Sequence, residues 1–397
     1  MELRGGPGKR ALMYSLRCLF LFGLTAIGSS AALGADQSNI QYVITNNDVV
    51  PPLPSKAAFF KVGSGGTLSQ SAVVSTDGYG IGGGFFAAQR VVVLQDGKSA
   101  CAFASNAGSG TIAGIDIHTL KPTGVFSGSG ADTGISNGIG LAVNSSYLYG
   151  SFTDSSNIGT FSVGAGCTLG FVGDVTVEGL QQGVINGMKL HGDLLVVTYD
   201  DGSIESFNVS GGMPVSNGDE QDSTGKGGSN FPTGIDVTQD GHWAIFGDVS
   251  NTTVVEVSDL SSGKLSKPVV YHLGSNVGSA NVLLSPDETL LYISNTQGDR
   301  LTAAWFDAST GELTKGCESG KLKGYGSDWA YLASLVTETN SGTGGAVYAA
   351  EFGAPSSIGI IEVKSSGGKC TLKESAKSPV QTAGSLLSIA GFPPRSF

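Results

Sequence analysis

Residues 283–295, LLSPDETLLYISN, place the polar turn 285–288 between two apolar runs. The stretch 234–246, GIDVTQDGHWAIF, repeats this arrangement with Asp240 and Gly241 at its turn. Glycine accepts the positive φ of primed hairpin turns, so Asp-Gly between alternating apolar runs predicts a β-hairpin. Each stretch therefore predicts two short antiparallel strands joined by a tight turn.

Two further strands follow each hairpin, at 253–257 and 268–273 in one copy and from 301–306 onward in the other. The unit recurs along the chain, and its second strands end near polar or small residues: Asn46, Asn106, Thr153, Asp200, Asp248, Asn295 and Glu351. These marks lie 47 to 60 residues apart. Seven such units predict an all-β fold, a seven-bladed β-propeller of four-stranded antiparallel blades. Helical periodicity is absent, and the 62 glycines disfavour helices.

The first unit lacks an inner strand. Its strands at 42–45, 57–62 and 71–74 correspond to the second, third and fourth strands of the other units. One apolar segment, 386–390, is left over after the fourth strand of the last unit. Placing it innermost in blade one pairs an edge that would otherwise be open. We therefore expect 386–390 to pair beside 42–45 and to close the ring.

The N-terminus has the order of a secretory signal peptide. Basic residues precede the apolar run 18–27, and small residues follow at 28–32. This run is too short to span a bilayer, and no later stretch approaches the ~20 apolar residues that a span needs. We interpret 1–35 as a signal peptide, with a buried N-terminal helix as the alternative. Residues 36–397 then form a single propeller domain that is secreted or periplasmic.

The predicted mature chain is strongly acidic. Of 22 Lys+Arg and 33 Asp+Glu residues, the segment 1–35 holds four and one, which leaves 18 against 32 and a net charge of −14. Nucleic-acid binding relies on basic patches, so we expect no such partner. The charge suits a small neutral or cationic ligand, or a protein or cell-surface partner, and we expect a monomer.

Four cysteines remain after the predicted cleavage. Cys317 and Cys370 both lie just past the third strand in adjacent units, which favours a disulfide between them. By exclusion, Cys101 would pair with Cys167, and four reduced cysteines are the alternative. An even number of cysteines in an exported chain is typical of disulfides. Metal binding is disfavoured because no Cys-x-x-Cys pair or nearby histidine completes a ligand set.

Propeller topology sorts the loops onto two faces. The fourth-to-first and second-to-third loops share one face, here named the upper face, and the remaining turns lie on the lower face. The upper interblade loops are long, polar and rich in glycine, and function concentrates in such loops on rigid scaffolds. We predict a binding site at the upper mouth from six residues: Arg90, Asn137, Asn186, Asn230, Asn281 and Trp329.

Asn and Asp side chains recur in the second-to-third loops, Asp48 and Asp201 among them. They could bind Ca²⁺ or a sugar-like ligand, or they could cap turns through the backbone. A compact Asp-x-Asp-x-Asp loop is absent, so we expect no cofactor, with Ca²⁺ as the alternative. His191 and His242 fall in lower-face turns and no Gly-x-Ser-x-Gly elbow is present, which disfavours a Ser-His-Asp site.

The stretch 283–295 resembles the SPDG…LYVSN blade of the lactonase-like seven-bladed propellers, a family that includes 6-phosphogluconolactonase and surface-layer or quinoprotein-like relatives. Residues 92–106, VVLQDGKSACAFASN, and 235–248, IDVTQDGHWAIFGD, are similar. The resemblance covers nearly all of the mature chain and implies the fold. It also implies an activity, lactone hydrolysis, in which Arg90 or a bound cation would stabilise the oxyanion. No matching funnel histidine is present, so we place a non-enzymatic binding or interaction role first and the hydrolase second.

Overall fold

The computed structural model describes residues 41–82, 89–97, 99–128, 138–223, 231–249, 252–275, 278–295, 300–324, 331–337, 345–352 and 356–394. All of them belong to the unit 40–397. The predicted signal peptide, 1–35, falls outside the described residues and stays a prediction. Among the described residues, no helix is long and apolar enough to cross a membrane.

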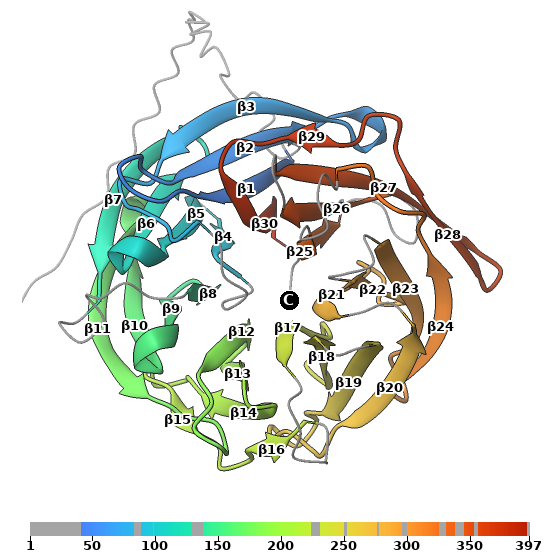
Figure 1. Cartoon of the computed structure of the whole chain (residues 1–397). Coiled ribbons are helices and arrows are strands. Elements are labelled where there is room, and N and C mark those ends of the chain that lie inside the picture. The colour runs from blue at the N-terminus through green and yellow to red at the C-terminus, as the bar shows by residue number, and fades with distance from the viewer. Residues whose placement is uncertain are drawn as a thin grey trace, which may run out of the picture. The chain divides into compact units, whose positions relative to one another are not determined.

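Seven antiparallel sheets form a ring of blades, each ordered from the centre outward (Figure 1). The innermost strands of blades 1 to 7 are β30 (Ser385–Phe392), β4 (Val91–Asp96), β8 (Ile139–Val143), β12 (Ile185–His191), β17 (Pro232–Val237), β21 (Ser279–Leu284) and β25 (Tyr331–Thr337). The second strands are β1 (Tyr42–Asp48), β5 (Ser99–Asn106), β9 (Tyr147–Phe152), β13 (Leu194–Tyr199), β18 (Trp243–Val249), β22 (Leu290–Asn295) and β26 (Gly345–Phe352). The all-β, seven-bladed prediction is therefore confirmed.

The outer half of each blade holds the third and fourth strands. The third strands are β2 (Lys56–Val62), β6 (Thr111–Asp116), β10 (Asn157–Gly164), β14 (Ser203–Asn208), β19 (Thr253–Asp259), β23 (Arg300–Asp307) and β27 (Ser357–Ser366). The fourth strands are β3 (Leu68–Ser75), β7 (Lys121–Ser127), β11 (Thr168–Thr176), β15 (Val215–Ser216) with β16 (Gln221–Asp222), β20 (Val269–Gly274), β24 (Glu312–Glu318), and β28 (Lys369–Glu374) with β29 (Val380–Gln381). Short 3₁₀ turns are η2 (Ser64–Gly66), η3 (Ala107–Ser109), η5 (Thr153–Ser155) and η6 (Ala165–Cys167).

Two blades depart from the expected four continuous strands. In blade 4 the outer edge is split, with β15 and β16 both pairing with β14. Gly218 lies between them with a φ of 62°, a conformation that interrupts an extended strand. In blade 7, β28 and β29 likewise share β27.

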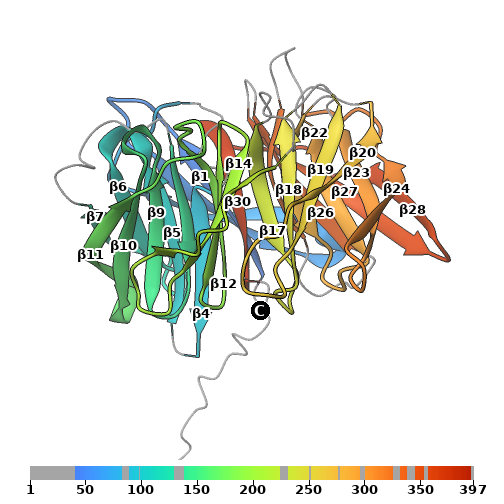
Figure 2. The ribbon, with the colours of Figure 1, turned by 90° about the horizontal axis from the view of Figure 1, so that it is seen from below.

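The C-terminal strand closes the ring as expected. β30 pairs antiparallel with β1, and Ile44 lies opposite Ala390. β1 in turn pairs with β2, so blade 1 combines both ends of the propeller unit. Figure 2 shows the blades from the side, with their strands running between the two faces.

Five inner strands carry a one-residue bulge near the upper face. In β12, Ile185 lies opposite Tyr199 and Gly187 opposite Thr198, so Asn186 is the extra residue. The register also shifts within the pairings of β17, β21, β25 and β30. Neighbouring inner strands approach closely here, because a Cβ on Gly187 would lie 2.1 Å from the carbonyl oxygen of Thr233. Bulges twist a strand locally and redirect its side chains.

The hydrophobic core lies between the blades. Val196 and Ile204 of blade 4, for example, pack with Ile235 and Phe246 of blade 5. Each blade therefore contributes one apolar face to each neighbour, and the removal of these faces from water stabilises the ring.

Two disulfides join neighbouring blades, and both predicted pairings are confirmed. Cys101 on β5 bonds Cys167 in η6, with a Cα–Cα distance of 5.5 Å. Cys317 on β24 bonds Cys370 on β28 at 5.7 Å. The second pair lies within the fourth strands, since these strands begin earlier than the sequence pattern indicated.

Candidate functional site

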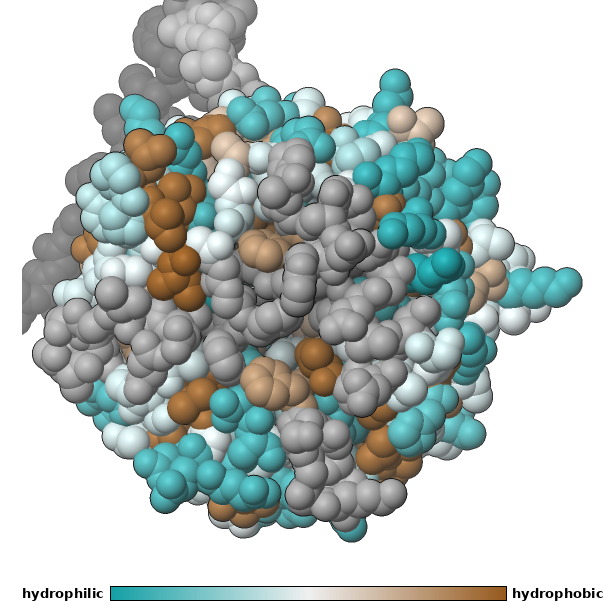
Figure 3. Space-filling model, viewed as in Figure 1, coloured by the Kyte–Doolittle hydropathy of each residue, from teal (hydrophilic) through white to brown (hydrophobic). Residues whose placement is uncertain are grey.

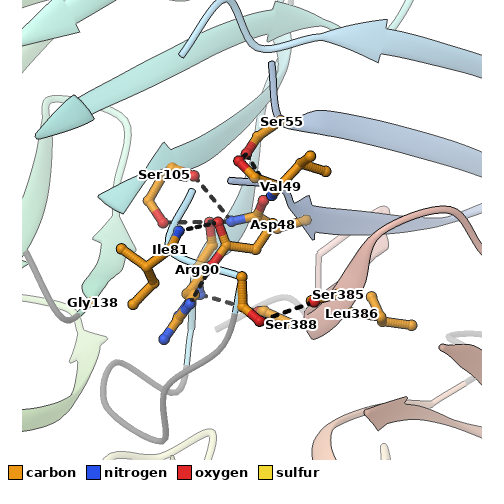
Figure 4. A network of polar contacts seen from close by, with 12 residues as sticks. Asp48, Val49, Ser55, Ile81, Arg90, Ser105, Gly138, Ser385, Leu386 and Ser388 are labelled. Carbon is orange, nitrogen blue, oxygen red and sulfur yellow. Dashed lines mark hydrogen bonds and ion pairs between the residues drawn. The ribbon is translucent and has the colours of Figure 1, made fainter. Parts of the chain in front are cut away.

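A buried ion pair joins blade 1 to the segment that leads into blade 2 (Figure 4). Arg90 Nη1 lies 2.9 Å from Asp48 Oδ2, and both side chains are buried. Asp48 Oδ1 accepts the backbone N–H of Ile81 at 3.0 Å. Burial raises the pKa of Asp48 above its ordinary value, while the Arg90 guanidinium acts against that rise. Arg90, predicted at the upper mouth, is thus held by a carboxylate of its own chain.

The backbone of Arg90 ties three strands together. Its N–H donates to Ser388 Oγ of β30 at 3.1 Å. Its carbonyl oxygen accepts Asn46 Nδ2 of β1 at 3.1 Å and the N–H of Ser105 of β5 at 2.9 Å. The position therefore connects the closing strand of blade 1 with blade 2.

The other described mouth residues, Asn186 and Asn281, are buried on inner strands. Asn186 Nδ2 donates to the carbonyl oxygen of Pro232 in the next blade at 2.7 Å. The backbone N–H of Asn281 donates to Ser294 Oγ at 2.8 Å within its own blade. The structure places both in contacts between strands, and their proposed contact with a ligand stays a prediction.

Three predicted site residues, Asn137, Asn230 and Trp329, lie outside the described residues. The structure therefore does not bring the six predicted residues together or separate them. Around the rim of the face seen in Figure 3, hydrophilic residues predominate and hydrophobic ones are scattered.

Four carboxylates gather at the upper end of blade 4, and we name them the blade-4 acidic cluster: Asp200, Asp201, Glu205 and Glu220. Asp200 Oδ1 accepts the N–H of Val184 at 2.8 Å. Asp201 Oδ2 accepts the N–H of Gln181 at 2.7 Å, so both aspartates hold the upper loop before β12. The expectation that such aspartates bind backbone groups is confirmed here.

The other two members of the cluster are Glu205 and Glu220, and the charge of Glu205 acts on Glu220. Glu205 Oε2 accepts the Tyr199 hydroxyl at 2.9 Å. Burial, together with the negative charges of Glu205 and Asp201, raises the pKa of Glu220 to about 7. The part of this rise that comes from the two neighbouring carboxylates reflects a negative local potential. Sequence reasoning missed Glu205 and Glu220, although Glu205 stands between inward-facing residues in the strand SIESFN.

A second pair of buried carboxyls, Asp248 and Glu256, lies on blade 5. Burial raises the pKa of Asp248 to about 6. The sequence analysis did not predict Glu256 as a site residue, although it stands in the strand TVVEVSD with a valine on each side.

The described part of the chain shows no metal centre. None of its groups of three or more His, Cys, Asp or Glu residues is arranged to hold a metal ion. His191 Nε2 lies 3.0 Å from the carbonyl oxygen of Gln239, and the ring of His242 stacks on Trp243 with centroids 4.6 Å apart. Both histidines lie at turns between first and second strands, where the topology predicts them.

No family model matches the chain, and no curated protein matches it. Solved structures do resemble it. A putative 6-phosphogluconolactonase from Bacteroides fragilis has 14% sequence identity and a TM-score of 0.66, with coverage of 90% of this chain and 99% of that one. The periplasmic gluconolactonase of Pseudomonas aeruginosa has 15% identity and a TM-score of 0.55, over 70% of this chain and 82% of that one.

A functionally unknown protein from Desulfotomaculum acetoxidans is similar at 14% identity and a TM-score of 0.61, over 89% of this chain and 99% of that one. At these identities the likeness concerns the fold. The chain is therefore a seven-bladed propeller of the lactonase-like fold, as the blade motif indicated. Function must be argued from the site, because one fold hosts many activities.

Proposed function

We propose that the chain is an exported binding propeller that takes a small cationic ligand on its upper face, over blade 4. The observation that carries this proposal is the blade-4 acidic cluster, in which the negative charges of Glu205 and Asp201 act on Glu220 in addition to burial. A cluster of like negative charges attracts an ammonium group placed beside it. The ion pairs among the described residues lie elsewhere, so none of them neutralises this cluster.

The binding surface is built on a fixed loop. Asp200 and Asp201 hold the backbone of the loop before β12 through hydrogen bonds from Val184, Gln181 and Gly183. A loop held in one conformation loses little entropy when a ligand binds. Two disulfides between blades support a location outside the reducing cytosol.

Calorimetric titration tests the proposal with three probes: putrescine, glucose and 6-phosphogluconate. We expect putrescine to bind, its affinity to fall steeply between ~20 and ~500 mM salt, and the anionic probe not to bind. Glu220→Gln should weaken putrescine binding roughly five- to tenfold, about 1 kcal/mol for one lost charge near the surface. Glu312→Gln removes an exposed charge on β24 of blade 6 and serves as the matched control. Equal losses in both variants, or preferred binding of the anion, would refute the proposal.

A second candidate is a lactone hydrolase, which the likeness to two proteins described as lactonases favours. A pH-stat assay with glucono-1,5-lactone, with and without chelator, tests it against the spontaneous rate. Catalysis that exceeds this rate and persists at low protein concentration would support the hydrolase. A rate equal to the spontaneous one would leave the binding role.

A further inference from the structure

One side-chain position recurs in successive blades, beside the upper face. A second-strand residue and the third-strand residue diagonal to it point from the same side of the sheet toward the preceding blade. In blade 4 these are Tyr199 and Glu205, and the tyrosine hydroxyl donates to Glu205 Oε2 at 2.9 Å. In blade 6 they are Asn295 and Thr302, joined by a 2.8 Å hydrogen bond from Asn295 Nδ2 to Thr302 Oγ1. In both blades a donor meets an acceptor.

Blade 5 has two carboxyls at the same position. Phe246 lies opposite Glu256 across β18 and β19, so Asp248 is the diagonal neighbour of Glu256 on that side of the sheet. Diagonal neighbours are within reach of long side chains. Two ionised carboxylates offer only acceptors, so no hydrogen bond can form between them without a proton.

Among the described residues, the donors that face the pair are the backbone N–H of Phe231 and the hydroxyl of Ser223. Asp248 and Glu256 are both fully buried. Asp248 Oδ1 accepts the N–H of Phe231 at 2.9 Å. Within the described ranges, Asp248 Oδ2 and both oxygens of Glu256 have no hydrogen-bond partner. A buried acceptor without a donor is costly, and an uncompensated buried carboxylate is more so.

Among the described residues, the charged group that acts on the pair from blade 4 is negative. Blade 4 faces the pair with the carboxylate of Asp222 and with Ser223, whose hydroxyl faces Glu256 without a hydrogen bond of normal geometry. On blade 5 itself, the negative charge of Asp248 acts on Glu256. The ion pairs between described residues involve other carboxylates.

We propose that Asp248 and Glu256 share one proton, with the Glu256 carboxyl donating a hydrogen bond to Asp248 Oδ2. This hydrogen bond stabilises the contact of blade 5 with blade 4, and it does so only while the proton is bound. The bond gives blade 5 the donor–acceptor contact that blades 4 and 6 make with tyrosine and asparagine. When the shared proton leaves, two buried negative charges face each other and Asp222. The seam between blades 4 and 5 is then weakened at its upper end. This inference does not depend on the proposed ligand.

The direction of the pH effect follows from the buried environment. Burial, and then the charge of Asp248, raises the pKa of Glu256 to about 8. An unfolded glutamate has a pKa of about 4.3, so the folded chain binds more protons between these values. The stability that the pair contributes is therefore complete at low pH and is lost as pH rises through the window toward 8.

Proton linkage tests this with urea unfolding between pH 5 and 8.5. The ratio of the wild-type unfolding constant to that of Glu256→Gln should rise about tenfold per pH unit, which corresponds to the release of one proton. The amide introduced by Glu256→Gln has a donor that does not titrate, so the variant should fold and lose this dependence. Asp248→Asn gives the same comparison from the other side of the bond. Glu312→Gln, exposed on β24, should keep the wild-type dependence.

Infrared spectroscopy supplies a second readout in the Glu220→Gln variant, which lacks another carboxyl whose pKa is raised, to about 7. At pH 6.5 this variant should show the carbonyl stretch of a protonated carboxylic acid, and this band should disappear above pH 8.5. Absence of the band at pH 6.5, or equal pH dependence in wild type and Glu256→Gln, would overturn the proposal. So would a titration midpoint that Ca²⁺ lowers and EDTA restores, because a cation that joins the two ionised carboxylates competes with the proton.

Discussion

Arg90→Met removes the positive partner of a buried carboxylate while keeping most of the side-chain volume. The guanidinium lies 2.9 Å from Asp48 Oδ2, and the two side chains are only 2% and 3% exposed. Removal of one member of a buried ion pair costs about 3–5 kcal/mol, because the other charge stays buried without compensation. For a unit of roughly 360 residues the entropy of unfolding is ~0.75 kcal/mol/K, so the loss lowers Tm by about 5 °C.

Differential scanning calorimetry of three variants measures this loss: Arg90→Met, Asp48→Asn and the double variant Asp48→Leu/Arg90→Met. We expect each single variant to lower Tm and the double variant to recover part of the loss, because it leaves no buried charge at this position. A shift below ~1 °C in Arg90→Met, or purely additive losses in the double variant, would refute the reasoning. The backbone contacts of Arg90 with Ser388 and Ser105 remain in every variant, so they do not account for a difference.

The remaining predictions concern the ring itself. A chain ending at residue 383 lacks β30 and should lose cooperative unfolding, as circular dichroism during heating would show; retention of a wild-type transition would contradict the closure. Cys101→Ser/Cys167→Ser opens a loop of 66 residues and should lower stability by about 4 kcal/mol in the chain-entropy model, measured by urea unfolding. An unchanged midpoint would show that the bond adds nothing. Gly187→Ala forces a Cβ to within 2.1 Å of the Thr233 carbonyl oxygen and should cost about 1–3 kcal/mol, with Gly211→Ala, whose Cβ would enter open space, as control. Equal effects of the two alanines would count against close packing of the inner strands.

The fold could be predicted because its signals are local. Tight polar turns such as 285–288 separate apolar runs at a regular spacing, and each turn fixes one hairpin without reference to distant residues. The position of segment 386–390 as the innermost strand of blade 1 followed from counting the strands of each unit. The pairing of Cys317 with Cys370 followed from equivalent places in neighbouring blades, and the pairing of Cys101 with Cys167 followed by exclusion.

The buried polar contacts could not be predicted in the same way. Apolar residues on both faces of TVVEVSD indicate that Glu256 is buried, but its diagonal partner depends on the register of β18 against β19. Asn186 was expected at the mouth because it follows a polar loop. A one-residue bulge turns its amide toward Pro232 of the next blade, and the sequence carries no signal for this contact.

The pairing of β1 with β30 sets an order of events during synthesis. β1 is made among the first strands of the propeller and β30 is its last, with Val43 opposite Gly391. Until residues 385–392 have left the ribosome, the inner edge of β1 has no partner, and an open strand edge invites pairing with other chains. The blades between them can form earlier through local hairpins, but the ring closes only after β30 has been made. A chain released before β30 is made therefore exposes the unpaired edge of β1, whereas β30 pairs with this edge in the folded chain.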